Sequence, residues 1–350
     1  MKILTAQVKS LLMSQQPTRN SRIAVLDLGT NTFHLLIVDV YPEGKCRKVF
    51  KSKIVVKLGE GGIHKSFITE KSFSRGIRAL KHYAEIIKKN QAREVYAFAT
   101  SAIRSAKNGP DFARVVLQQT GIRIKIISGE EEARLICLGV RQCIEMNDEA
   151  VLIMDIGGGS TEFIIADKEN IFARHSFNIG AARLLELFNP SDPVNEDEVL
   201  KVEKFLKDQL SDLDKSIKKF PVNKLIGSSG SFDTFAEMIG YKFHNKNVLK
   251  NVNSYDFELS EYCELHDELL LSTKAQRNKM KGLIKMRVDM IVLASICTSF
   301  VLKRYSLNEM ALSKFALKEG ALWEIINKVV KSNSANGIKT GREPHFVKTD

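Results

Sequence analysis

The sequence lacks the features that mark several classes of protein. It has no apolar run approaching the roughly 20 residues that a membrane span needs. The first residues, MKILTAQVKSLLMSQQ, contain no continuous apolar core and no small-residue cleavage site, which argues against a secretory signal. The five cysteines are scattered and form no C-x-x-C pair, as is typical of reduced thiols rather than of disulfides or a zinc site. We therefore expect a cytoplasmic protein that does not contact a membrane.

The sequence also contains no G-x-x-x-x-G-K-[ST] motif, which excludes the P-loop class of nucleotide-binding proteins. What it has in excess is positive charge, with 53 Lys and Arg against 41 Asp and Glu and a net charge of +12. A polyanionic partner accounts for such a charge, and so does a generally lysine-rich surface. The lysines are spread along the chain without interleaved aromatic residues. Composition therefore does not choose the partner. The motifs described below favour a phosphate-rich molecule, which explains the charge as well as nucleic acid does, and nucleic acid is disfavoured.

Hydrophobic periodicity predicts two similar halves. Residues 22–40 read as a β-hairpin, and residues 150–167 repeat it. Both hairpins are followed by strands alternating with helices. Strands are expected at 48–58, 94–100, 122–128 and 171–178, and helices at 68–89, 130–140 and 196–220, with 254–330 mostly helical. A chain of 350 residues suits about two domains.

We therefore predict an α/β protein with two lobes around a central cleft. The expected segments are a flexible arm (1–20), lobe one (21–128), lobe two (129–312), a C-terminal helix that returns to lobe one (313–330), and a flexible tail (331–350).

The repeated hairpins carry the strongest chemical signal. Residues 27–39 read DLGTNTFHLLIVD and residues 155–167 read DIGGGSTEFIIAD, and the two align without a gap. A glycine turn lets backbone N–H groups approach phosphate oxygens, and a Gly/Ser turn before a helix, such as GSSGS at 227–231, does the same. Any one of these turns could be purely structural, but two that begin equivalent lobes would face one cleft. The predicted phosphate-binding residues are Gly29, Thr30, Asn31, Thr32, Gly157, Gly158, Gly159, Ser160, Ser228, Ser229, Gly230 and Ser231.

Acidic residues near these turns suggest a metal and a catalytic base. An acid beside a phosphate nest is repulsive unless a cation lies between them, so Asp155, Glu162 and Asp27 are candidate Mg²⁺ ligands. Ser128 and Glu131 have the spacing of a capping box, which leaves Glu132 as the acid that the cap does not employ. A carboxylate there could polarise a water for attack on phosphorus.

One arginine and one histidine complete the candidate set. Arg104 follows a predicted strand, at a position where its guanidinium could bind phosphate. His34 stands where the second hairpin has Glu162, and either packs beneath its loop or takes part in catalysis.

The motifs together resemble those of one family. VLDLGTNTFHLLI, ATSAIRSAKNG, ISGEEEARLICLGV, MDIGGGSTEF, NIGAARL, IGSSGS and ALSKFALKEGAL occur in order across about residues 22–325. The chain is identified by them as similar to the exopolyphosphatase / guanosine pentaphosphate phosphohydrolase family, of the actin-like ATPase superfamily. The resemblance implies two RNase H-like lobes and Mg²⁺-dependent hydrolysis of a terminal phosphoanhydride bond. It also implies Glu132 as general base, Glu162 as a metal or water-positioning acid, Asp155 as a metal-associated acid and Arg104 as a phosphate ligand.

The leading function is thus an exopolyphosphatase that releases orthophosphate from inorganic polyphosphate. The alternatives are a guanosine pentaphosphate 5′-phosphohydrolase, a sugar-kinase-like ATP-binding enzyme and a non-catalytic polyphosphate sensor. A homodimer is carried as a hypothesis.

Overall fold

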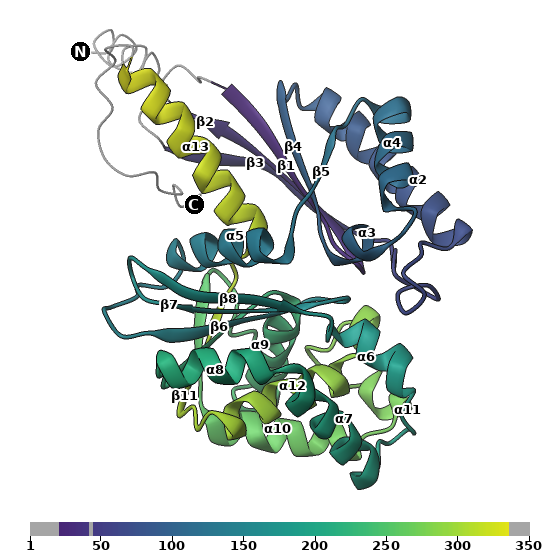
Figure 1. Cartoon of the computed structure of the whole chain (residues 1–350), viewed down its shortest axis with the longest axis vertical. Helices are drawn as coiled ribbons and strands as arrows, with labels where there is room; N and C mark the ends of the chain where they lie inside the picture. The colour runs from purple at the N-terminus through teal and green to yellow at the C-terminus, as the bar shows by residue number, and fades with distance from the viewer. Residues whose placement is uncertain (1–20, 42–44, 336–350) are drawn as a thin grey trace, which may run out of the picture.

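The computed structural model describes residues 21–41 and 45–335 and arranges them as two α/β lobes (Figure 1). The predicted arm (1–20) and residues 336–350 of the predicted tail lie outside the described residues. The last helix continues to Ala335, so the prediction that the tail begins at 331 was wrong. Within the described residues, no helix is both long enough and apolar enough to cross a membrane.

Lobe one is built on a five-stranded sheet in the order β3-β2-β1-β4-β5. Its strands are β1 (Ser21–Leu28), β2 (Thr32–Val40), β3 (Cys46–Val55), β4 (Glu94–Ala99) and β5 (Ile124–Ile126). Its helices are α2 (Glu70–Lys89), α3 (Ser101–Ser105) and α4 (Gly109–Thr120). The first three strands are antiparallel neighbours, and β4 and β5 continue the sheet in parallel.

Lobe two repeats this order and adds one strand. Its sheet runs β10-β11-β9-β6-β7-β8, in which β8-β7-β6-β9-β11 corresponds to β3-β2-β1-β4-β5. The strands are β6 (Val151–Ile156), β7 (Thr161–Ala166), β8 (Ile171–Phe177), β9 (Lys224–Ser228), β10 (Ser254–Phe257) and β11 (Glu309–Ser313). The topology confirms the predicted pair of RNase H-like lobes.

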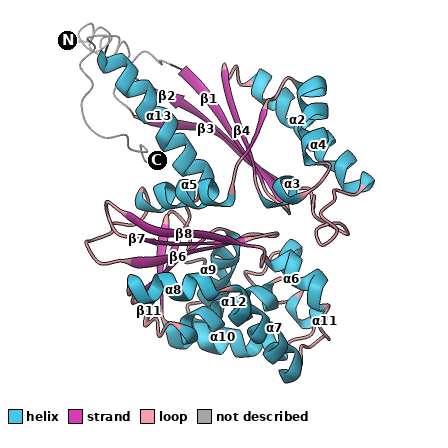
Figure 2. Ribbon diagram, in the orientation of Figure 1, coloured by secondary structure: helices cyan, strands magenta, loops and turns pink. Residues whose placement is uncertain are grey.

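The helices of lobe two alternate with the later strands in sequence and cover one face of its sheet (Figure 2). They are α6 (Ala181–Phe188), α7 (Glu196–Gln209), α8 (Ser211–Lys219), α9 (Gly230–Phe243), α10 (Leu259–Leu271), α11 (Lys274–Arg277), the 3₁₀ helix η1 (Lys285–Arg287) and α12 (Ile291–Arg304). The single helix expected at 196–220 is two helices that meet at Leu210. The region 254–330, expected to be mostly helical, also contains β10 and β11.

Two helices form a layer shared by the lobes. In Figure 1, α5 (Gly129–Arg141) and α13 (Leu317–Ala335) lie between the two sheets. One apolar cluster joins Val25 of β1, Ile136 of α5 and Leu322 of α13 to Ile153 of β6. Because strand residues alternate in direction, the neighbours of Val25 in β1 face the other way, onto α2 and α4.

Two glycines allow the backbones of α5 and α13 to lie in direct contact where the helices cross. A side chain at Gly139 would overlap the backbone of Ala316, and one at Gly320 would overlap the backbone of Leu135. This crossing brings together the first turn of α5, which carries Glu132, and the first turn of α13, which carries Lys318. Both side chains reach the space between the lobes.

A buried histidine in lobe two predicts acid lability. His266 of α10 is 7% exposed, lies 3.2 Å from the hydroxyl of Ser295 through Nδ1, and has its pKa lowered by burial to about 4. Between about pH 6.5 and 4 this histidine is protonated in the unfolded chain but not in the folded protein. The free energy of unfolding therefore decreases as the pH falls from about 6.5 toward 4. The full effect is about 3 kcal/mol. The free energy of unfolding is measured with urea at pH 7.5 and pH 4.5. Between these two values we expect it to fall by about 2 to 3 kcal/mol less in His266→Gln than in the unmodified protein. Equal losses in both proteins would contradict this assignment.

Candidate active site

The two repeated hairpins fold into matching turns. The N–H of Gly29 donates to the carbonyl of Thr32 over 3.0 Å, and the N–H of Gly157 donates to the carbonyl of Ser160 over the same distance. The pairing register places Asp27 opposite His34 in lobe one and Asp155 opposite Glu162 in lobe two. The sequence repeat is therefore a structural repeat, down to the pair of positions at which the copies differ.

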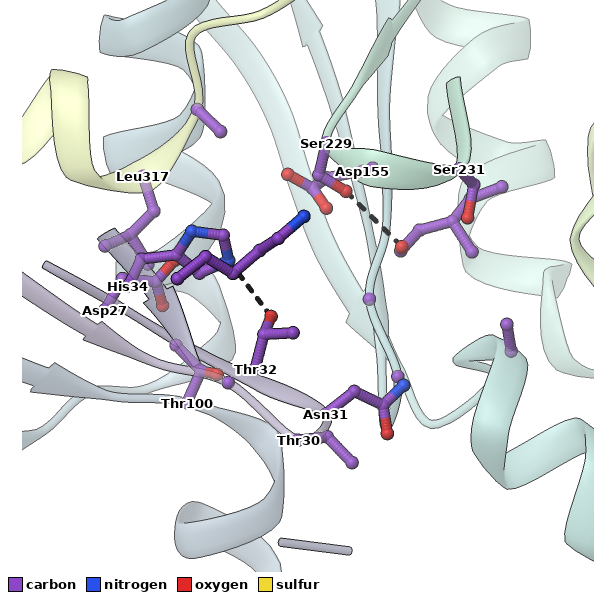
Figure 3. Close-up of a pocket in the computed structure, with 18 of the residues that line it drawn as sticks. Asp27, Thr30, Asn31, Thr32, His34, Thr100, Asp155, Ser229, Ser231 and Leu317 are labelled. Carbon is purple, nitrogen blue, oxygen red and sulfur yellow. Dashed lines mark hydrogen bonds between the residues drawn. The ribbon is translucent and has the colours of Figure 1, made fainter. Parts of the chain in front are cut away.

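These turns face each other across a cavity of about 450 Å³. Figure 3 shows Asp27, His34 and Thr32 on one side and Asp155, Ser229 and Ser231 on the other. Most residues predicted from the sequence line it: Asp27, Gly29, Thr30, Asn31, Thr32, Glu132, Asp155, Gly157, Gly158, Gly159, Ser160, Ser229, Gly230 and Ser231. Arg104, Glu162 and Ser228 do not line it, although each contacts a residue or a backbone segment next to it.

The predicted base and the predicted phosphate-binding arginine form an ion pair. Arg104 Nη1 lies 2.6 Å from Glu132 Oε2, and the same guanidinium also donates to the carbonyl of Ile127 and the hydroxyl of Ser176. Burial raises the pKa of Glu132 well above its ordinary value, and the nearby Glu162 raises it further, while Arg104 opposes both. Arg104 thus does not line the cavity itself, and it contacts the site by its ion pair with Glu132.

Glu162 sits behind the second phosphate turn. Its Oε1 accepts hydrogen bonds from the hydroxyls of Ser160 at 2.6 Å and Ser176 at 2.7 Å. Burial and the neighbouring Asp155 raise the pKa of Glu162 to about 7. Because Ser160 lines the cavity and Glu162 does not, the structure connects this acid to the cavity through a serine hydroxyl.

The two aspartates fit a magnesium ion. Burial raises the pKa of Asp27 to about 7, and Asp155 adds to the rise, so the two carboxylates repel each other across the site. Burial likewise raises the pKa of Asp155, although the hydroxyls of Ser229 and Ser228 oppose the rise. Mg²⁺ is commonly held by one or two carboxylates, waters and substrate phosphates. Within the described residues no three His, Cys, Asp or Glu side chains gather into a group that could hold a metal ion, so Mg²⁺ at this site stays a prediction.

Sequence reasoning missed several charged residues of the cavity wall. Lys318 is buried and pairs with Glu319 at 3.1 Å; burial opposes its charge, but Glu319 and Asp27 outweigh burial and raise its pKa. Four more cations line the cavity: Lys51, Lys53, Arg287 and Lys314. They come from distant elements, so no local spacing could reveal them. Lys314 and Lys318 do fall within the family motif ALSKFALKEGAL, and this motif was the one feature of the sequence that could have indicated them.

His34 lines the cavity as a neutral side chain. Burial and the cations Lys318 and Lys53 lower its pKa well below the ordinary value. Its Nε2 lies 3.0 Å from the hydroxyl of Thr32. With one nitrogen engaged by the turn and no charge at neutral pH, His34 supports the first phosphate turn.

Arg287 lies against the third phosphate turn. Its Nη1 donates to the hydroxyl of Thr234 over 2.7 Å, and a side chain at Gly230 would overlap its guanidinium. Beside it, Asp233 Oδ1 is buried and has no hydrogen-bond partner within the described chain. Both side chains line the cavity.

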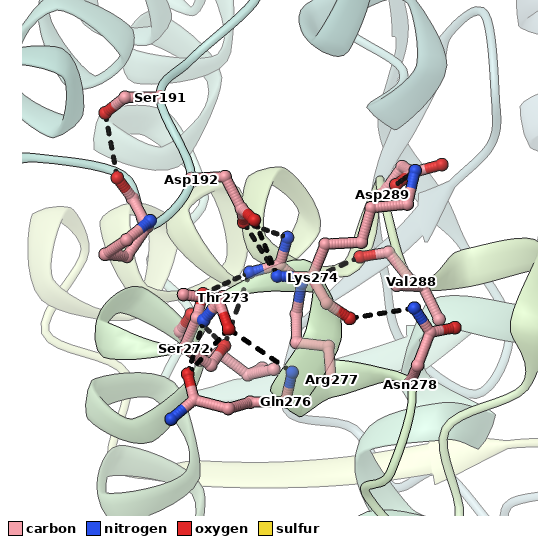
Figure 4. A network of polar contacts seen from close by, with 12 residues as sticks. Ser191, Asp192, Ser272, Thr273, Lys274, Gln276, Arg277, Asn278, Val288 and Asp289 are labelled. Atoms are coloured by element: carbon pink, nitrogen blue, oxygen red, sulfur yellow. Dashed lines mark hydrogen bonds and ion pairs between the residues drawn. The ribbon is translucent and has the colours of Figure 1, made fainter.

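A polar network fixes the segment that carries Arg287 (Figure 4). Buried Arg277 donates to the carbonyls of Ser272 and Val288 and pairs with Asp192 at 2.7 Å. Lys274 pairs with Asp289 at 2.6 Å, which ties the same segment to α11. The end of η1 is therefore anchored from outside the cavity.

The capping box predicted at the start of α5 forms only in part. Ser128 caps α5 by accepting from the N–H of Glu131 over 3.1 Å. The Glu131 carboxylate, however, pairs with Arg134 at 2.8 Å instead of completing a capping box. Arg134 also pairs with Glu324 of α13, so it holds the two central helices together rather than facing the cavity.

The fold and the site together define a two-lobed α/β protein whose paired glycine turns line one cavity. The chain belongs to the Ppx/GppA phosphatase family, whose model matches residues 37–329. This confirms the family resemblance that the motifs carry.

Solved structures and other relatives agree with this family membership. An exopolyphosphatase from Cytophaga hutchinsonii is 38% identical, with a TM-score of 0.84 over 92% of this chain and all of that one. An Aquifex aeolicus Ppx/GppA family member is 25% identical, with a TM-score of 0.72 over 89% of this chain and 99% of that one. Exopolyphosphatase 1 of Mycobacterium leprae is 26% identical over 86% of this chain and 88% of its own length.

One relative is much longer. A bifunctional 3-dehydroquinate synthase/phosphatase of Fusobacterium nucleatum is 31% identical over 86% of this chain, which spans 46% of that protein. Only part of that protein therefore corresponds to this chain.

Proposed function

We propose that this protein is a Mg²⁺-dependent exopolyphosphatase that releases orthophosphate from the end of an inorganic polyphosphate chain. One observation carries the proposal: Glu132, a buried carboxylate, lines the same cavity as two facing phosphate turns. The names of two relatives, from Cytophaga hutchinsonii and Mycobacterium leprae, support polyphosphate as the substrate.

The phosphate turns bind the terminal phosphoryl group. Backbone N–H groups and hydroxyls at 29–32 and 157–160 approach it from opposite lobes, and the turn at 229–231 offers a third set at the start of α9. Lys318 and Arg287 add positive charge to the wall. These fixed dipoles and charges stabilise the charge that develops on the phosphoryl oxygens in the transition state.

Glu132 accepts the proton of the attacking water. The water oxygen forms a bond to the terminal phosphorus while the bond from that phosphorus to the bridging oxygen breaks, and the bridging oxygen stays on the shortened chain. Arg104 orients the Glu132 carboxylate and opposes the rise in its pKa that burial causes. Asp27 and Asp155 would hold Mg²⁺, which neutralises phosphate charge when it is bound.

A second candidate is hydrolysis of guanosine pentaphosphate. The cavity wall includes Met286, Met290, Ile291 and Leu317, an apolar surface on which a nucleobase could rest. This surface lies beside the cationic residues, so a nucleotide could place its phosphates in the same cradle.

A substrate panel separates these functions. Orthophosphate release is measured from polyphosphates of several lengths, guanosine pentaphosphate and ATP, each with and without Mg²⁺. We expect Mg²⁺-dependent release with the highest kcat/KM on polyphosphate. A higher kcat/KM on the guanosine nucleotide would favour the second candidate. Binding of polyphosphate without any release would favour the sensor alternative, and activity on ATP alone would overturn both.

A further inference from the structure

One side of the cavity is closed by contacts between the lobes. Residues 58–66 of lobe one, here called the latch segment, follow β3 and turn toward α6 of lobe two. Arg183 of α6 donates through Nη1 to the carbonyl of Ile63 and through Nε to the carbonyl of Gly159, each over 2.9 Å. Its guanidinium thus bonds the latch segment and the second phosphate turn at the same time.

Two further hydrogen bonds strengthen this closure. The N–H of Gly61 donates to Glu186 Oε1 over 2.9 Å, and His64 Nε2 lies 2.9 Å from the carbonyl of Arg183. On its own side, the latch segment is bonded to the first phosphate turn, because the N–H of Gly59 donates to the carbonyl of Thr30. The latch segment therefore connects the phosphate turns of both lobes.

The closed side leaves no room for a passing chain. A methyl group at Gly159 would lie 2.6 Å from Ser101 Oγ and 2.7 Å from Thr30 Oγ1, and one at Gly158 would lie 2.6 Å from Asn31 Nδ2. A phosphate unit is larger than a methyl group and cannot pass between the loops at these two glycines, although both turns still line the cavity. The cavity extends instead along Lys51, Lys53 and Lys314, while neither Arg183 nor the latch segment lines it.

We propose that Arg183, Glu186 and the latch segment make the cavity a dead end, so that only the free end of a polyphosphate chain can reach Glu132. The inference rests on the proposed function, and it assigns to Arg183 the role of a positioning residue. A chain interior would have to leave on both sides of the reacting phosphorus. Arg183 prevents this by holding the phosphate turns of the two lobes together.

The test uses Arg183→Met, which keeps the length of the side chain and removes both hydrogen bonds, and Arg183→Lys, which keeps one donor group. Arg114→Met is the matched control, since Arg114 is an exposed arginine whose ion pair, with Asp111, lies within α4. Spin labels on cysteines at the exposed positions Lys65 and Leu187 report the distance across the latch, in a background where Cys143 and Cys263 are serine. Phosphate release is measured on polyphosphates with free ends and with both ends blocked as small esters.

We expect unmodified protein and Arg114→Met to cut only chains with free ends. Arg183→Met should lengthen the distance between the labels, lower phosphate release about tenfold or more, and cut blocked chains into fragments, with Arg183→Lys in between. Cutting of blocked chains by the unmodified protein would overturn the inference. The inference would also be overturned if the distance between the labels were the same in Arg183→Met as in Arg114→Met. It would be overturned as well if that distance lengthened in Arg183→Met while blocked chains stayed uncut. If the unmodified protein released no phosphate from free-ended chains, the proposed function would fail. The distance between the labels would still show whether Arg183 holds the latch segment against α6.

Discussion

Replacing Glu132 with Gln should reduce kcat for phosphate release by about 10²- to 10⁴-fold, because a positioned general base contributes that much to rate. Gln keeps the shape of the side chain and can still accept a hydrogen bond from Arg104, but it cannot take the proton of water. The phosphate turns are untouched, so polyphosphate should bind with a Kd within about threefold of the unmodified value. Single-turnover phosphate release and a separate binding titration measure the two quantities.

The neighbouring acid supplies the control. Glu131 lies on the same helical turn, but its carboxylate pairs with Arg134 outside the cavity. Glu131→Gln should therefore keep kcat within about twofold. If the two variants behave alike, Glu132 is not the base.

The pH profile gives an independent check on the same residue. Since burial and Glu162 raise the pKa of Glu132, kcat/KM of the unmodified protein should rise with pH through a range above that of an ordinary glutamate. The Glu132→Gln variant should lack this rise.

Replacing Asp155 with Asn should lower activity at least about 100-fold and weaken Mg²⁺ binding at least about tenfold. Asp155 and Asp27 are carboxylates from opposite lobes on one cavity, and their mutual repulsion is relieved by a cation between them. Isothermal titration with Mg²⁺ measures the binding of the metal without relying on turnover, and so does a comparison of thermal stability with and without Mg²⁺.

Asp167 is the control for this prediction, because it closes the same hairpin that Asp155 opens. Its carboxylate accepts from the N–H groups of Glu169 and Asn170 in a turn at the far end of β7. Asp167→Asn should leave the Mg²⁺ titration unchanged. A Mg²⁺ response that survives in Asp155→Asn would place the ion elsewhere.

The predictable part of the site is the part made by short stretches of chain. A buried strand, a glycine turn and a second strand lie within 20 residues at 21–40 and within 16 residues at 151–166, so alternation and turn composition were enough to predict both hairpins. The same holds for Glu132 on the first turn of α5, where the cap at Ser128 sets the start of the helix.

Other features depended on partners distant in sequence. β10 and β11 have too few residues to show a clear period, and each becomes a strand because it pairs with a neighbour, β11 alongside β9 and β10 alongside β11. The helix expected at 196–220 divides at Leu210, whose backbone lies outside the helical region with φ −91° and ψ 15°. Neither outcome is visible in local propensity.

The sequence by itself determined the two equivalent lobes and their paired glycine turns, since these follow from local pattern and internal repetition. It predicted Asp27 and Asp155 from their places beside the turns, and it predicted Glu132 partly through the family resemblance. Only the tertiary structure decided that Glu162 lies behind its turn, that Arg104 reaches the cavity through Glu132, and that Lys318 and Arg287 complete the wall. It also decided that Arg183 closes one side of the cavity. The physical reason is that charge, burial and hydrogen bonding depend on which segments the fold brings together, and these segments are up to hundreds of residues apart in the chain.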